Sequence, residues 1–220
     1  MHSKALFSLA LAGFASAAKI SCAPYYTGQF LAYNPDLETS VPAGFINGVV
    51  DAQGRKIVSI DNNGKSPAPM ALTFFQCFSQ FMRSGQTTDS GTTVTYGIVT
   101  GAKHVNKCIT LSSVLKATGP TYTVSSDCKS TDTVANQLPQ WFKLTEQPSS
   151  ANPNVINRYL SIDGSPNTTS TLINYGYYSL KAYQSKKLST QLNGKAVFLE
   201  YLWSPSDAGT DFTFGIGNPL

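Results

Sequence analysis

The sequence lacks an apolar run long enough to cross a membrane. Its main apolar stretch covers about ten residues, from Ala5 to Phe14. A helix that rises about 1.5 Å per residue needs about twice that length to span roughly 30 Å of hydrocarbon. We therefore expect no membrane-spanning segment.

Charge and metal-binding residue types are also scarce. Charged residues make up 13% of the chain, and the formal net charge is only +4. The dense basic spots are Arg55-Lys56 and Lys186-Lys187, each typical of a solvated surface pair, so nucleic acid is not an expected partner. The sequence has two histidines, His2 and His104, and no C-x-x-C pair, so we expect no metal site and no cofactor.

The motifs of common hydrolases are missing as well. There is no G-x-S-x-G turn to present a serine nucleophile. The glutamates are few, namely Glu38, Glu146 and Glu200, and most aspartates stand in turn sequences, where they hydrogen-bond to their own backbone. His104 lies in a polar turn between two expected strands, which is typical of a solvated loop residue. We predict that the protein is not an enzyme and has no catalytic residues.

The N-terminus has the three parts of a secretory signal. Lys4 precedes the apolar stretch, and the small residues Ala15-Ser16-Ala17-Ala18 follow it. We expect residues 1–18 to be a cleavable signal peptide and residues 19–220 to form one mature domain. The expected location is secreted and extracellular.

The cysteine count and one glycosylation sequon agree with secretion. The even set Cys22, Cys77, Cys108 and Cys128 predicts two disulfides in an oxidising compartment, with three pairings open from counting alone. Asn167-Thr168-Thr169 is an N-glycosylation sequon, so Asn167 is a candidate glycosylation site on an exposed loop.

Short β-branched and aromatic runs, separated by Gly, Pro, Asn, Asp and Ser, dominate the mature chain and predict an all-β fold. Helical periodicity is nearly absent. The expected strands are residues 29–33, 45–51, 56–60, 71–77, 93–100, 107–112, 122–126, 141–145, 158–162, 177–183, 196–202 and 211–215.

The loop spacing divides the chain into three units of about four strands each. They cover residues 22–82, 83–147 and 148–220, and a barrel closed by them would bury their aromatic residues and leave no long open edge. Polar stretches at 84–93, 147–154 and 164–170 lack core-forming residues and are expected to be loops.

Residues 96–144 resemble one repeat of the ricin-B-type β-trefoil family. The similarity is carried by Gly97-Ile98, Lys107-Cys108-Ile109-Thr110-Leu111, residues 122–128 and Asn136-Gln137-Leu138-Pro139-Gln140-Trp141. The resemblance implies a β-trefoil of three four-stranded units. It also implies a disulfide between Cys108 and Cys128 inside the repeat, which leaves Cys22 for Cys77.

Two departures from the family concern its sugar site. The Gln-x-Trp motif is degraded, with two extra residues between Gln137 and Trp141. The aspartate that contacts sugar in the family is replaced by Thr110, while Asn136 matches the family asparagine. The replacement at Thr110 counts against a sugar site in the second unit. We expect Trp141 to lie in the core.

Aromatic residues supply another possible sugar platform. Tyr175, Tyr177 and Tyr178 form a cluster whose rings could stack on sugars, although packing into the barrel or its rim is the alternative. Together with Asn136 they are the candidate carbohydrate-binding residues. The hypothesis is a secreted, non-catalytic, ricin-B-like lectin whose partner is a glycan or glycoprotein. The alternatives are a β-trefoil protease inhibitor acting through an exposed loop, and a secreted interaction protein without sugar binding.

Overall fold

The computed structural model describes residues 18–34, 39–62, 66–113, 121–163, 177–184, 196–204 and 213–219. For residues 34, 39, 61, 62, 177–184 and 196–204 it describes the backbone only. Residues 1–17 of the predicted signal peptide and Asn167 therefore lie outside the described residues.

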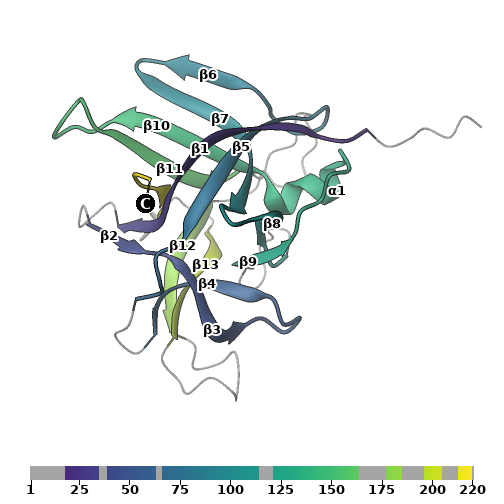
Figure 1. Ribbon diagram of the computed structural model, residues 1–220, viewed down its shortest axis with the longest axis vertical. Coiled ribbons are helices and arrows are strands. Elements are labelled where there is room, and N and C mark those ends of the chain that lie inside the picture. The colour runs from purple at the N-terminus through teal and green to yellow at the C-terminus, as the bar shows by residue number, and fades with distance from the viewer. Residues whose placement is uncertain are drawn as a thin grey trace, which may run out of the picture.

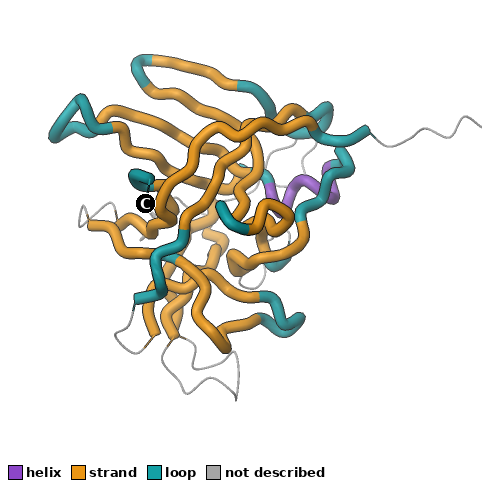
Figure 2. The backbone as a smooth tube through the Cα atoms, viewed as in Figure 1, coloured by secondary structure: helices purple, strands orange, loops and turns teal. Residues whose placement is uncertain are grey.

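Strands make up most of the described chain (Figures 1 and 2). They are β1 Ser21–Asn34, β2 Thr39–Pro42, β3 Gly44–Val50, β4 Lys56–Asn62, β5 Ala71–Phe78, β6 Gln86–Asp89, β7 Thr92–Gly101, β8 His104–Leu111, β9 Thr121–Asp127, β10 Phe142–Pro148, β11 Ile156–Ile162, β12 Tyr177–Gln184, β13 Ala196–Ser204 and β14 Thr213–Ile216. One helical segment, α1 Val134–Gln137 continued by the 3-10 turn η1 Leu138–Gln140, precedes β10.

Six of the strands close into an antiparallel barrel. They follow the order β10, β11, β14, β1, β5 and β7, and pairing of β10 with β7 completes the ring. Closure gives each of these strands a hydrogen-bonded neighbour on both sides, which removes the open edges that would otherwise promote aggregation. In Figure 1 most of these strands lie in the upper half of the molecule.

Three hairpins stand between the barrel strands in the sequence. They are β3–β4, β8–β9 and β12–β13, and they also pair with one another, through β4–β9, β9–β13 and β13–β4. Along the chain, each hairpin follows one barrel strand and precedes the next, so β1 and β5, β7 and β10, and β11 and β14 flank the three hairpins.

The main hydrophobic core fills the barrel. Each barrel strand contributes buried side chains to one cluster, which includes Phe30, Phe74, Val99, Leu144, Leu160 and Phe214. Burial of each large apolar side chain stabilises the fold by about 1.5–3 kcal/mol. A separate cluster of Val49, Ile57 and Val124 lies between the hairpins β3–β4 and β8–β9.

Both expected disulfides are present. Cys22 is bonded to Cys77, and Cys108 to Cys128, as the resemblance implied. Their sulfurs lie in a second buried cluster with Trp141, Met82 and Leu138. The placement of Trp141 in the core is thereby confirmed, since its side chain is fully buried. Within the described ranges, no helix has both the length and the apolar character needed to cross a membrane.

The all-β prediction is confirmed, and every expected strand overlaps an observed one. The predicted loop at 84–93 is wrong, because its residues form β6 and the start of β7. The turn at Ser90-Gly91 has positive φ at both residues (49° and 80°), as a tight hairpin requires. Likewise, Gln147 and Pro148 continue β10 instead of beginning a loop. The β-trefoil assignment stays a prediction.

Candidate ligand pocket

A pocket of about 290 Å³ opens where the second hairpin meets α1 and η1. Three segments near one another in sequence form most of it, and Arg55 reaches it from the turn between β3 and β4. The lining residues are Arg55, Thr110, Leu111, Ser112, Ser113, Ser126, Asp127, Lys129, Ala135, Asn136, Pro139 and Gln140. Its volume is at the lower end of small-molecule sites, about 300–1,000 Å³.

The disulfide Cys108–Cys128 fixes the two strands that bear the pocket. Cys108 stands two residues before Thr110, and Cys128 lies between Asp127 and Lys129. Strand pairing places Cys108 opposite Ser126 and Thr110 opposite Val124. The covalent link therefore holds the lining residues of β8 and β9 in a constant register.

Two buried glutamines fix the third side of the pocket. Gln137 Nε2 donates to the carbonyls of Lys129 (2.9 Å) and Thr131 (2.8 Å). Gln140 accepts from Lys129 N–H (3.0 Å) and donates to its carbonyl (2.7 Å). The residues between Gln137 and Trp141 thus form the 3-10 turn η1. Gln137, at the end of α1, and Gln140, within η1, tie this turn to the residues that follow β9.

The next residue anchors the same turn to the segment between β5 and β6. Trp141 Nε1 donates to the carbonyl of Arg83 at 2.7 Å. Thr133 caps α1 by accepting from Asn136 N–H at 3.3 Å, an interaction that satisfies one of the free donors at the start of a helix. The backbone that carries Asn136 is therefore well fixed.

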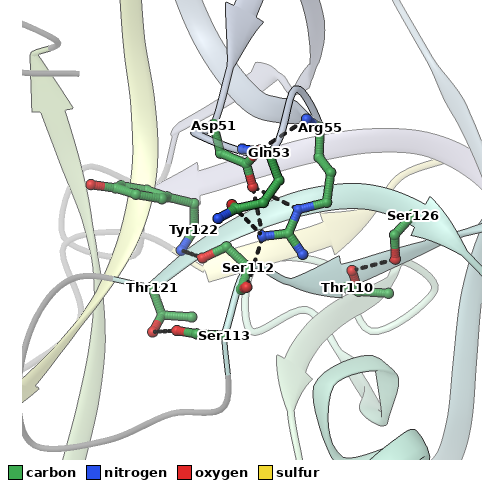
Figure 3. A network of polar contacts seen from close by, with 9 residues as sticks. All are labelled: Asp51, Gln53, Arg55, Thr110, Ser112, Ser113, Thr121, Tyr122 and Ser126. Carbon is green, nitrogen blue, oxygen red and sulfur yellow. Dashed lines mark hydrogen bonds and ion pairs between the residues drawn. The ribbon is translucent and has the colours of Figure 1, made fainter. Parts of the chain in front are cut away.

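The hydroxyls of the pocket are already partly paired (Figure 3). Thr110 Oγ1 and Ser126 Oγ share a hydrogen bond of 2.9 Å, and Ser113 Oγ shares one of 3.0 Å with Thr121 Oγ1. Ser112 Oγ accepts from Tyr122 N–H at 2.9 Å, which leaves its own O–H to donate. A hydroxyl can donate once and accept twice, so each keeps capacity for a ligand.

Asn136 has the most hydrogen-bonding capacity to offer. It is half-buried and lines the pocket, and its side-chain amide makes no hydrogen bond with any residue of the described ranges. The amide provides two donors and a carbonyl acceptor. The same group can therefore donate to one hydroxyl of a ligand and accept from another.

Arg55 closes one side of the pocket. Its Nε donates to Asp51 Oδ2 at 2.6 Å, and its Nη2 donates to the Ser112 carbonyl at 2.8 Å. Asp51 is only 4% exposed and also accepts from the backbone N–H groups of Gln53 and Arg55. These bonds hold the turn between β3 and β4 against the end of β8.

One carboxylate lines the pocket. Asp127 accepts from Lys107 Nζ at 2.6 Å. This hydrogen bond, with the charges of Lys107 and Lys129, lowers the pKa of Asp127 below its usual value, so the group remains ionised at neutral pH.

The structure brings together two residues that the sequence resemblance singled out. Thr110 and Asn136, which are 26 positions apart in the sequence, line the same pocket. Of the tyrosine group, Tyr175 lies outside the described residues, and Tyr177 and Tyr178 are described only as backbone at the start of β12. Their role as carbohydrate-binding residues stays a prediction.

Other residues were predicted differently or not at all. Arg55 was expected to belong to a solvated basic pair, but it is half-buried against Asp51 and lines the pocket. The signal that could have indicated this is the Asp51-x-x-x-Arg55 spacing across a glycine-containing turn. His104 is exposed at the first position of β8. Sequence reasoning also missed Lys129.

Across the described residues, no group of three or more His, Cys, Asp or Glu side chains is arranged to hold a metal ion. The pocket offers hydroxyls, amides and charged side chains beside the apolar Leu111, Ala135 and Pro139, a mixture that suits an organic ligand with both polar and apolar surfaces. No protein-family model matches the chain, and no significant match occurs among curated proteins or solved structures.

Proposed function

We propose that this protein is a secreted, non-catalytic carbohydrate-binding protein with a β-trefoil fold of the ricin-B-like kind. The fold assignment is supported by the alternation of barrel strands with three mutually paired hairpins. Two disulfides favour an oxidising compartment, in agreement with the proposed secretion.

The pocket is the observation that carries the binding proposal. Asn136 presents an amide that makes no hydrogen bond with a described residue, beside the hydroxyls of Thr110, Ser112 and Ser126. Neighbouring sugar hydroxyls each donate and accept hydrogen bonds, so they match this mixture of groups. Pro139 adds an apolar surface for the C–H face of a sugar ring.

Replacement of the family aspartate by Thr110 changes how the site would work. A carboxylate only accepts hydrogen bonds, whereas a hydroxyl and an amide also donate them. Binding in this pocket therefore depends on Asn136 and the hydroxyls instead of a central carboxylate. A second site around Tyr175, Tyr177 and Tyr178 remains part of the proposal.

The first test is a glycan-array screen of the purified protein, followed by competition with the free sugar. We expect Asn136→Ala to weaken binding about fivefold, the effect of losing one or two net hydrogen bonds. Asn154→Ala is the matched control, because Asn154 is exposed in the turn after β10 and does not line the pocket. An array with no bound glycan at high protein concentration would overturn the proposal.

If Asn136→Ala and Asn154→Ala bind glycans equally well, the pocket is not the binding site. The tyrosines would then be the next residues to substitute. The protease-inhibitor alternative predicts a different result, namely inhibition in a protease panel and no glycan on the array. In the candidate inhibitor segment 84–93, residues 86–89 are hydrogen-bonded to β7, so a protease could pair only with the opposite edge of β6.

A further inference from the structure

The guanidinium of Arg55 is only partly used by its protein contacts. Its Nε and Nη2 are bonded to Asp51, Gln53 and Ser112. Nη1 makes no hydrogen bond to a residue that the structure describes, and Figure 3 draws it without a dashed line. Since Arg55 lines the pocket, two N–H donors of a fixed cation remain available there.

Lys129 provides a second cation at the pocket. Its backbone N–H and carbonyl are held by Gln140, and the carbonyl also by Gln137. Its side chain is exposed and forms no ion pair within the described ranges. The position of the side chain on the pocket wall is thus fixed at its base while its ammonium group is free to bind.

The one lining carboxylate does not cancel these charges. Asp127 is paired with Lys107, and Arg55 with Asp51. Among the lining residues, two cations, Arg55 and Lys129, therefore stand beside one carboxylate, Asp127. The surplus positive charge is that of Lys129, and the uncommitted donors of Arg55 add to it.

We propose that the pocket selects sugars that carry a carboxylate, such as uronic acids, over their neutral parent sugars. The inference rests on the proposed carbohydrate-binding function and names its ligand class. The carboxylate binds Arg55 Nη1 and the Lys129 ammonium, and the ring hydroxyls bind Asn136 and the neighbouring serines and threonine. Guanidinium and carboxylate groups form strong charge-assisted hydrogen bonds.

The test compares matched sugar pairs by calorimetric titration of the purified protein. The pairs are galacturonic acid with galactose and glucuronic acid with glucose, each differing by a carboxylate in place of CH₂OH. We expect the acid to bind about tenfold more tightly than its neutral parent in at least one pair. The preference should shrink as NaCl is raised, because salt screens exposed charges.

Charge-reversal variants identify the residue responsible. Lys129→Glu should remove most of the preference for the acid, since repulsion replaces attraction. Lys103→Glu is the matched control, because Lys103 is exposed in the turn between β7 and β8, does not line the pocket, and changes the net charge equally. It should leave the preference unchanged.

These experiments distinguish failure of the acidic-sugar inference from failure of the proposed function. Equal affinity for acid and neutral parent, or an unchanged preference in Lys129→Glu, overturns the acidic-sugar inference and leaves the lectin proposal standing. Competition by inorganic phosphate as effective as that by the acidic sugar also overturns it, since the site would then recognise any anion. If no sugar binds in either this titration or the glycan array, the proposed function fails as well.

Discussion

Two arginine–carboxylate pairs in this molecule differ in what surrounds them. In the barrel, Arg158 on β11 donates to Glu146 on β10 at 2.8 Å, across directly opposed strand positions. Tyr25 donates to the other carboxylate oxygen at 2.5 Å, and the arginine lies 3.8 Å over the Tyr26 ring. Gln86 in turn donates to Tyr25 at 3.1 Å. Both oxygens of Glu146 are therefore bonded.

Arg55 and Asp51 form the same kind of ion pair, but one of its members lines the pocket. Its carboxylate is buried and bonded within its own turn, while its guanidinium lines a pocket. Among the described contacts neither guanidinium uses all of its donors, since Arg158 donates through Nε and Nη1 and Arg55 through Nε and Nη2. Of the two, Arg55 lines the pocket, where its remaining donors can bind a ligand. We infer that the barrel pair serves stability and the pocket pair serves recognition.

The largest expected effect is on the barrel pair. Glu146→Ala leaves Arg158 and the Tyr25 hydroxyl without their partner, so we expect the free energy of unfolding to fall by about 2 kcal/mol. Chemical denaturation measures this loss, and sugar affinity should not change. Asp89→Ala removes an exposed carboxylate and is the control, with an expected change below about 0.5 kcal/mol. Equal effects of the two substitutions would refute a stabilising role for the barrel pair.

A smaller effect isolates the Tyr25 hydroxyl. Burial, then its bond to Glu146, raises the pKa of Tyr25 above its ordinary value of 10.0. The neutral hydroxyl therefore stabilises the fold fully below pH 10, and this contribution is lost as the pH rises through the raised pKa. We expect Tyr25→Phe to lower the free energy of unfolding by about 1 kcal/mol at pH 7.

Denaturation at several pH values tests the sign of this linkage. The difference between the native protein and Tyr25→Phe should shrink above pH 10. Tyr96→Phe is the matched control at pH 7, because the Tyr96 hydroxyl makes no hydrogen bond with a described residue. A difference that grows above pH 10 would contradict the assignment of the hydroxyl as a donor to Glu146.

The barrel and the pocket also differ in how well the sequence predicts them. Barrel strands such as β5 and β7 have runs of apolar and β-branched residues, so their positions could be predicted from local pattern. Two short strands beside the barrel are harder to predict. The first, β6, is Gln-Thr-Thr-Asp and wholly exposed, and the second, β2, has only four residues. Neither carries the alternation that marks a half-buried strand.

The pocket depends on contacts that no local pattern contains. Resemblance to a family singled out Thr110 and Asn136, and folding brings them to one cavity. Arg55 comes from a different hairpin, and the pairing of β4 with β9 together with the Arg55–Ser112 hydrogen bond places its turn at the end of β8. In the sequence alone, Arg55 stands next to Lys56, and such a basic pair is equally typical of a solvated surface.

The smallest effect separates charge from geometry at the pocket pair. Arg55→Lys keeps a cation beside Asp51 but replaces the planar fork with a single ammonium group. We expect a loss of stability of only about 0.5 kcal/mol, because the ion pair is retained. If Nη1 contacts the ligand, affinity for the acidic sugar should fall about fivefold, while that for the neutral parent changes less. Unchanged acidic-sugar affinity would mean that Arg55, like Arg158, serves only the fold.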